Sequence, residues 1–297
     1  NDFELALTAD DVERIVKNGK IASLIGIEGG VAIENSFAQL RAFHALGARY
    51  MTLTHNVTLD WADAANGEHK HDGLTPFGER VVAEMNRLGI LVDISHVSPA
   101  TMVDALRVTR APVIASHSSA YALCPSPRNV PDDVLALVKQ NDGVIMVNFY
   151  SGFIVPGSAA KAKQVADEFK TKYPDAEERK KALKAWYLTD ESKSVRGTIQ
   201  DVANHIDHLV NVAGIDHVAI GSDFDGIARW PIGLEDVSDY PRLTDELTRR
   251  GYSDEDLYKI LGSNVLRAFR KAGEVARELQ ATTPPEVEAI KPEPTED

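Results

Sequence analysis

Short apolar segments alternate with longer helix-like segments along most of this chain of 297 residues. The apolar segments are rich in Val and Ile and are apolar throughout, which is typical of parallel strands buried on both faces. Strand–helix alternation leaves a closed barrel or an open doubly wound sheet. No Gly-x-Gly-x-x-Gly follows a strand, which disfavours a dinucleotide-binding sheet. We expect strands at Ile21–Ile27, Arg49–Thr54, Ile90–Ser95, Pro112–Ser116, Gly143–Phe149 and His217–Ser222.

The segments between these strands have the start and stop signals of helices. Ser98 precedes Pro99, and Thr75 precedes Pro76, so each pair offers an N-cap followed by a proline in the first turn. Glycines such as Gly89 follow the expected helix ends. We expect helices at Ser36–Leu46, Pro76–Leu88, Pro99–Val108, Pro131–Gln140 and Thr198–Ala213.

The length suits one barrel domain, which we place at residues 1–280. Residues 156–197 form an insertion that we expect to be a helical excursion at the barrel mouth. Residues 281–297 combine four prolines with acidic side chains, so we expect this tail to be disordered. The charges of the insertion are most simply a solvated face, and they include Lys161, Lys163, Lys170, Lys172, Lys180, Lys181 and Lys184.

Composition excludes several classes of protein. A formal net charge of -13 disfavours nucleic acid as a partner, because phosphate backbones would be repelled. No apolar run approaches the roughly 18 residues of a membrane span, and no signal peptide is visible at the start. The single Cys124 excludes an internal disulfide and any multi-cysteine metal site. The sequence leaves the compartment open and is compatible with a homodimer.

Polar side chains follow five of the six expected strands. They are Glu28, His55, His96, His117 and Asp223. The carboxyl ends of barrel strands meet at one rim, where active sites lie. A lone histidine there is usually a hydrogen-bonded structural residue and a lone aspartate is usually a cap. Together, however, imidazoles and carboxylates are a ligand set for Zn²⁺, so the combination favours a metal site.

The other six of the nine histidines are expected on helices, in a loop or at the start of a strand. None of these positions is the carboxyl end of a strand, where the active site is expected. We leave them out of the candidate site; they are His44, His69, His71, His205, His208 and His217.

The strand-end residues lie within motifs that resemble those of the membrane (renal) dipeptidase family of zinc metallopeptidases. The resemblance runs from about Ile15 to Phe269 and implies a (β/α)8 TIM-type barrel of the metal-dependent hydrolase kind. The motifs are Gly26–Gly30, Thr52–Asn56, Asp93–Ser98, Ser116–Tyr121, Arg128–Asp133 and Gly221–Gly226.

The resemblance implies a role for each matching residue. Glu28 resembles the carboxylate that bridges two zinc ions, and His96 and His117 resemble the ligands of the second zinc. Asp223 resembles the catalytic acid and base. Two further residues resemble substrate-binding groups: His55, which supports the tetrahedral intermediate, and Arg128, which grips the substrate. These roles imply a zinc-dependent dipeptidase with two zinc ions in a complete site and dipeptides as substrates; β-lactam amides are open to the same chemistry.

The sequence departs from the family pattern in several places. No His-x-Asp pair, the family's further ligands of the first zinc, precedes Glu28. Six strand–helix units are visible where a barrel needs eight, so we expect the first two units to be missing. A natural variant with one metal or none is the rival explanation. Phe153 stands where mammalian relatives have tyrosine, and the 156–197 insertion is longer than theirs.

Two other functions stay open. A different barrel amidohydrolase could act on lactones or phosphotriesters, although a neutral phosphotriester does not need the carboxylate anchor that Arg128 offers. A truncated, metal-poor barrel could instead act as a binding protein, which a count of bound metal would distinguish.

Overall fold

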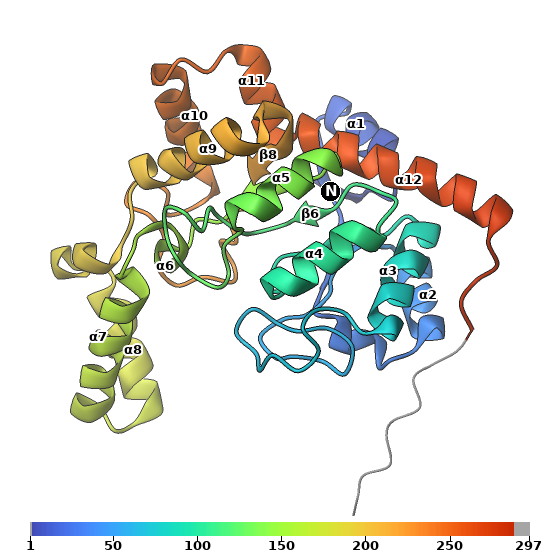
Figure 1. The fold of residues 1–297 in the computed structure, drawn as a ribbon. Coiled ribbons are helices and arrows are strands. Elements are labelled where there is room, and N and C mark those ends of the chain that lie inside the picture. Colours follow the sequence, from blue (N-terminus) through green and yellow to red (C-terminus); the bar gives the residue numbers. More distant parts are fainter. Residues whose placement is uncertain (1, 288–297) are drawn as a thin grey trace, which may run out of the picture. The chain divides into compact units, whose positions relative to one another are not determined.

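The computed structural model describes residues 2–287 and divides the chain into two units. The first unit comprises Asn1–Ser116, Asp133–Val144 and Gly262–Asp297. The second unit comprises His117–Asp132 and Ile145–Leu261. Figure 1 shows the strands and helices of both units in sequence colours.

Four parallel strands in sequential order form the sheet of the first unit: β3 (Ile25–Glu28), β4 (Ala48–Thr52), β5 (Leu91–Asp93) and β6 (Ile114–Ala115). Their last residues lie in register, because Glu28 pairs with Thr52 and Thr52 pairs with Asp93. The connecting helices are α2 (Phe37–Ala45), α3 (Pro76–Leu88) and α4 (Pro99–Val108), and α5 (Asp132–Gln140) follows β6. The parallel α/β fold expected from the sequence is confirmed.

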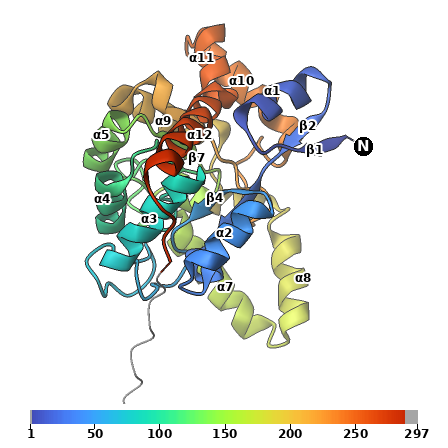
Figure 2. The same cartoon turned by 90° about the vertical axis from the view of Figure 1, so that its right-hand side faces the viewer.

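The core of this unit lies between the strands and the helices. Fully buried side chains include Met51 on β4, Phe37 on α2 and Met85 on α3. The long helix α12 (Asn264–Thr282) packs against α3, as Figure 2 shows. Strands β5 and β6 are buried along their whole length, as expected for parallel strands covered on both faces, whereas β3 is largely exposed.

An additional strand–helix unit precedes Glu28, and the sequence analysis missed it. Strand β1 (Phe3–Leu5), helix α1 (Ala9–Lys17) and strand β2 (Ile21–Ser23) follow one another, and β1 pairs with β2 in parallel. The expected strand at Ile21–Ile27 is therefore two strands, β2 and β3, with different partners. The chain thus holds one more strand–helix unit than the six that were expected.

Two strands of the second unit, β7 (Val144–Val147) and β8 (Val218–Ile220), pair in parallel. Only the first residue of β7, Val144, is assigned to the first unit. The helices of the second unit are α6 (Ser151–Ile154), α9 (Ile199–Ala213), α10 (Tyr240–Arg249) and α11 (Asp254–Tyr258). Short 3-10 segments lie at Gly30–Ile33 in the first unit and at Asp190–Val195, Ile215–His217 and Val237–Asp239 in the second. A π-helical turn at Lys259–Ser263 precedes α12.

The segment at 156–197 contains two helices that lie side by side, α7 (Ser158–Lys172) and α8 (Ala176–Trp186) (Figures 1 and 2). Ala162, Trp186 and Val195 form a small apolar cluster of their own, with Phe169 packed against it. All seven lysines named for this segment are exposed.

Helix α12 ends at Thr282, so the tail that was expected from residue 281 begins two residues later. Most of this expected tail, residues 288–297, lies outside the described residues. Within residues 2–287, none of the helices combines the length and apolar character that a membrane crossing requires.

Candidate metal centre

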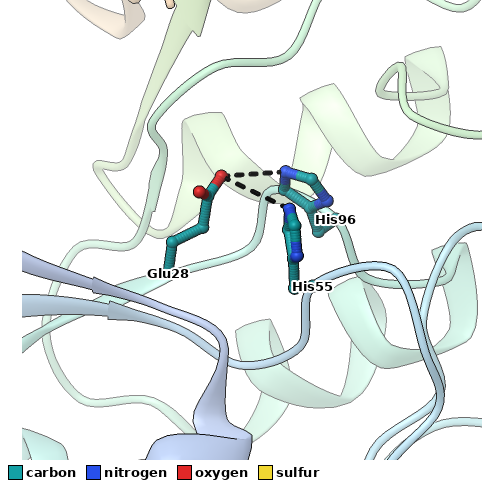
Figure 3. Close-up of side chains that lie close together, drawn as sticks. All are labelled: Glu28, His55 and His96. Carbon is teal, nitrogen blue, oxygen red and sulfur yellow. Dashed lines mark ion pairs between the residues drawn. The ribbon is translucent and has the colours of Figure 1, made fainter. Parts of the chain in front are cut away.

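Three of the residues selected from the sequence lie together at strand ends of the first unit (Figure 3). Glu28 ends β3, and His55 and His96 each follow the end of a strand by three residues. Glu28 Oε1 lies 3.1 Å from His96 Nε2 and 3.9 Å from His55 Nε2. One potential ligand atom from each residue lies within 4.8 Å of the others. The two imidazole rings are 4.5 Å apart between centroids.

This cluster is open on one side. The side chains of Glu28 and His55 are 51% and 42% exposed, whereas that of His96 is 8% exposed. Ligand atoms that face each other and remain accessible suit an ion that must also meet a substrate.

The backbone of His96 is in the left-handed region, with φ at 65°. This conformation costs about 1–3 kcal/mol in a residue other than glycine and persists only where the surroundings hold it. The carbonyl oxygen of His96 accepts hydrogen bonds from Ala65 N at 2.7 Å and from Thr54 Oγ1 at 3.0 Å. These bonds fix the peptide that carries the imidazole.

The two glycines after Glu28 are required by the turn at the end of β3. Gly29 has φ at 115°, which side chains rarely allow. A Cβ atom on Gly30 would lie 2.6 Å from both Leu53 O and the ring of Trp61. The chain can therefore turn closely over β4 directly after the glutamate.

The loop between His55 and α3 is held by the buried carboxylate of Asp63, which accepts hydrogen bonds from the N–H groups of Lys70, His71 and Gly73. Burial raises the pKa of this carboxyl group, but the three backbone hydrogen bonds outweigh burial and leave the pKa below its usual value. His71 Nε2 also contacts Leu59 O at 2.9 Å, so this histidine has a structural partner.

The donor set fits a divalent transition metal. A carboxylate oxygen and two imidazole nitrogens are ligands that Zn²⁺ accepts, and their separation is close enough for one ion to be shared. Of the three predicted ligands, Glu28 and His96 are brought together here. His117 belongs to the second unit, so its convergence with them stays a prediction.

In the second unit, Asn148 at the end of β7 connects two of the selected residues. Its Nδ2 atom donates to Asp223 Oδ2 at 3.1 Å and to the backbone oxygen of His117 at 3.5 Å. Asp223 has φ at 63°, and a Cβ atom on Gly226 would lie 2.2 Å from its Oδ1 atom. Sequence reasoning missed Asn148, although it follows the one strand end to which no polar residue was assigned.

Arg128 is buried, at 2% exposed, and its guanidinium lies over the ring of Phe153 at 5.1 Å from the centroid. The neighbouring Asn129 side chain accepts from Ser119 N at 3.0 Å and donates to Cys124 O and Phe153 O at 2.8 Å each. The arginine therefore extends from a loop whose backbone is fixed on several sides.

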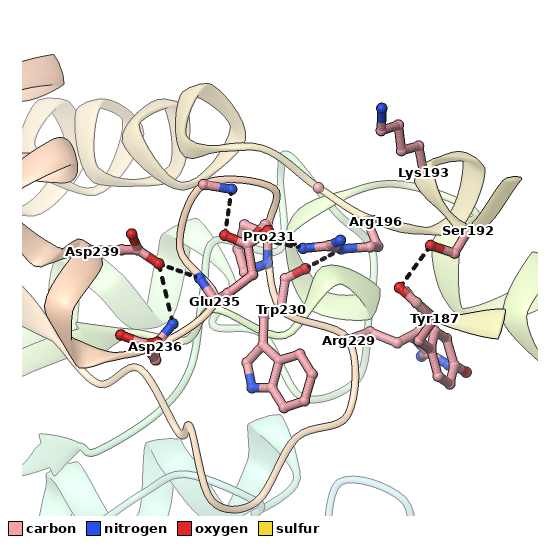
Figure 4. Close-up of polar contacts among 12 residues, drawn as sticks. Tyr187, Ser192, Lys193, Arg196, Arg229, Trp230, Pro231, Glu235, Asp236 and Asp239 are labelled. Atoms are coloured by element: carbon pink, nitrogen blue, oxygen red, sulfur yellow. Dashed lines mark hydrogen bonds and ion pairs between the residues drawn. The ribbon is translucent and has the colours of Figure 1, made fainter. Parts of the chain in front are cut away.

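The loop after β8 is anchored by Arg196 (Figure 4). The guanidinium donates to Trp230 O at 2.8 Å, to Pro231 O at 3.2 Å and to Glu235 Oε1 at 2.6 Å. Because Asp223 lies near the start of this loop, three residues after β8, Arg196 limits the freedom of the loop from its far end.

His205 on α9 was left out of the candidate site, and the structure gives it a structural place. Its Nδ1 atom accepts from Ala120 N at 3.0 Å, and its Nε2 atom lies 3.1 Å from Ile154 O. This pairing requires a neutral ring that is protonated at Nε2. Burial lowers the pKa of His205 to about 4.

Parallel strands with a carboxylate and imidazoles at their carboxyl ends are typical of metal-dependent hydrolases built on (β/α) barrels. The chain belongs to the membrane dipeptidase family, peptidase family M19, whose sequence pattern matches residues 1–283. The family resemblance inferred from the motifs is confirmed.

Two curated relatives are fungal dipeptidases. The chain is 44% identical to dipeptidase aclJ of Aspergillus oryzae over 275 residues, covering 92% of this chain and 57% of the relative. It is 43% identical to dipeptidase tcpJ of Claviceps purpurea over 283 residues, covering 95% of this chain and 58% of the relative. The chain thus spans less than two thirds of the length of these relatives.

Two solved structures have similar folds. The probable dipeptidase PvdM from Pseudomonas aeruginosa matches with a TM-score of 0.80 and 26% identity, over 93% of this chain and 75% of its own. A metallopeptidase from Rhodobacter sphaeroides, liganded with a phosphinate mimic of the dipeptide L-Ala-D-Ala, matches with a TM-score of 0.74 and 28% identity, over 91% of this chain and 69% of its own.

Proposed function

We propose that this chain carries the catalytic site of a zinc-dependent dipeptidase. The observation that carries the proposal is the cluster of Glu28, His55 and His96 at the strand ends of a peptidase family M19 chain. The names of the curated relatives, and the dipeptide mimic bound to the Rhodobacter enzyme, support the same substrate class.

Glu28, His96 and His117 would hold zinc, with Glu28 shared between two ions. When bound, zinc polarises a carbonyl oxygen and lowers the pKa of water towards about 7, which provides a nucleophile near neutral pH. The fit rests on one carboxylate and imidazole nitrogens, a donor set that needs no cysteine.

Asp223 is the proposed acid and base. Its carboxylate would take a proton from the attacking water and deliver that proton to the amine that leaves when the peptide bond breaks. The Asn148 Nδ2 group donates to Asp223 Oδ2, and this hydrogen bond fixes the orientation of the carboxylate. His55 would donate a hydrogen bond to the oxyanion that develops on the peptide carbonyl.

Arg128 is the proposed anchor for the free carboxylate of the substrate. A guanidinium can pair with a carboxylate through two parallel hydrogen bonds, which fixes both distance and orientation. In a dipeptide the terminal carboxylate lies one residue beyond the scissile bond, so an anchor of this kind favours dipeptides over longer chains. The Phe153 ring supports the guanidinium from one face.

The test is to remove metal from the purified chain with a chelator, restore zinc and measure hydrolysis of a simple dipeptide. We expect turnover only after zinc is restored, and loss of turnover in His96→Ala. His69→Ala, in an exposed part of the loop, is the matched control and should keep turnover. Zinc binding without hydrolysis of any dipeptide would contradict the proposed function.

A further inference from the structure

Asp93 is a buried carboxylate at the end of β5, three residues before His96. It is fully buried, at 0% exposed, and it accepts four hydrogen bonds. Oδ1 accepts from Ser95 N at 3.0 Å and from Ser116 N at 2.9 Å. Oδ2 accepts from Thr52 Oγ1 and from Ser116 Oγ, both at 2.6 Å.

These partners belong to three neighbouring strands. Thr52 ends β4, Ser95 follows β5 and Ser116 follows β6. Each also stands close in sequence to a candidate site residue, since Ser95 directly precedes His96, Ser116 directly precedes His117 and Thr52 precedes His55 by three. One carboxylate therefore fixes the strand ends from which three histidines extend.

The strand register places Asp93 in the same row as the glutamate of the cluster. Glu28 pairs with Thr52, and Thr52 pairs with Asp93. Side chains in one row of a parallel sheet point to the same face, and adjacent strands lie about 4.8 Å apart. Thr52 thus stands between the two carboxylates, and its hydroxyl donates to Asp93.

All four donors to Asp93 are neutral. Within residues 2–287, no lysine, arginine or histidine forms an ion pair with this carboxylate. A buried charge without a counter-ion is costly unless hydrogen bonds and a nearby opposite charge offset it. A cation held in the same row of the sheet would provide that opposite charge.

We propose that Asp93 is a positioning residue of the metal centre, which holds the ends of β4, β5 and β6 together and adds a fixed negative charge that favours cation binding. The inference rests on the metal site proposed above. Asp93 acts through Thr52, Ser95 and Ser116 and is not itself assigned as a ligand.

The central test is Asp93→Asn in the whole chain. The amide keeps the shape of the carboxylate: its oxygen can accept from the two backbone N–H groups, and its nitrogen can donate to the hydroxyls of Thr52 and Ser116, which accept as well as donate. The negative charge alone is lost. We expect the zinc dissociation constant, measured by competition with a chelator, to rise roughly 10- to 100-fold, as for other residues that orient ligands. The melting temperature of the metal-free chain should stay unchanged or rise.

Glu84→Gln is the matched control, because Glu84 is a buried carboxylate of the same unit that already pairs with Arg41 and Arg87. It should leave zinc affinity unchanged. Thr52→Val and Ser116→Ala each remove a hydroxyl donor while keeping the charge, and each should weaken zinc binding by roughly 2- to 10-fold.

Wild-type zinc affinity in folded Asp93→Asn would overturn the inference. If Asp93→Asn does not fold, Thr52→Val and Ser116→Ala decide, and unchanged affinity in both would overturn it equally. Failure of the unchanged chain to bind zinc would instead overturn the proposed metal site and this inference with it.

Discussion

The buried imidazole of His205 should make the stability of the chain fall in acid. Its ring accepts a hydrogen bond from Ala120 N, which a protonated ring cannot do. Its pKa in the folded chain is about 4, against an ordinary value of 6.5. Protons therefore bind the unfolded state more tightly, so the free energy of unfolding is highest above pH 6.5 and declines as the pH falls towards 4.

The magnitude follows from these two pKa values. At 1.36 kcal/mol for each pH unit, the loss amounts to about 3 kcal/mol between pH 6.5 and 4. For a domain with a stability of about 5–15 kcal/mol, this is a large fraction of the total.

The assay is urea unfolding of the wild-type chain and of His205→Asn at several pH values from 7 to 4. The asparagine oxygen can still accept from Ala120 N, but the side chain does not titrate. The wild-type chain should be more stable than the variant at pH 7, and this advantage should shrink by about 3 kcal/mol by pH 4. His69→Asn controls for the removal of a histidine. An advantage that stays constant from pH 7 to pH 4 would refute the assignment of a neutral, buried His205.

Three further outcomes are expected for the second unit. Asp223→Asn should keep its zinc but lower kcat about 100-fold or more, and loss of the metal in this variant would mean that the aspartate is a ligand and not the acid and base. Arg128→Lys should reduce kcat/KM for a dipeptide more than for its C-terminally amidated analogue, because an ammonium cannot form the two parallel hydrogen bonds of a guanidinium; equal effects would remove Arg128 from carboxylate recognition. Gly226→Ala should lower kcat about tenfold with little change in KM, because its Cβ atom would lie 2.2 Å from Asp223 Oδ1 and must displace that carboxylate; wild-type kcat would show that the carboxylate position does not matter.

Elements with local signals were predicted closely. The helices expected at Pro76–Leu88 and Pro99–Val108 match α3 and α4 to the residue. Thr75 accepts from Gly78 N and Ser98 accepts from Thr101 N, as the cap-and-proline pattern implies. Such signals depend on neighbours in the chain, so a sequence contains them in full.

Features that depend on distant partners were not predicted. Strand β1 has three residues, one of them Glu4, and its two ends are exposed, so only its pairing with β2 identifies it as a strand. Asn148 was missed because it lies inside the strand expected at Gly143–Phe149, and only the observed end of β7 at Val147 shows that it follows a strand end. The network around Asp93 depends on the register of three strands, which no local pattern specifies.

Backbone strain supports two of the residues that were selected from sequence. Within residues 2–287, six residues other than glycine have positive φ, and four of them lie outside the proposed sites: Glu34, Asn35, Asp72 and Asp142. The other two are His96 and Asp223, each three residues beyond the end of a strand. A glycine at either position would avoid a cost of about 1–3 kcal/mol but would have no imidazole or carboxylate to offer. The strained positions therefore include one residue of the proposed metal site in the first unit and the proposed acid and base in the second. This evidence is independent of the ligand distances and of the family motifs, and it supports two of the five strand-end residues selected from the sequence, His96 and Asp223.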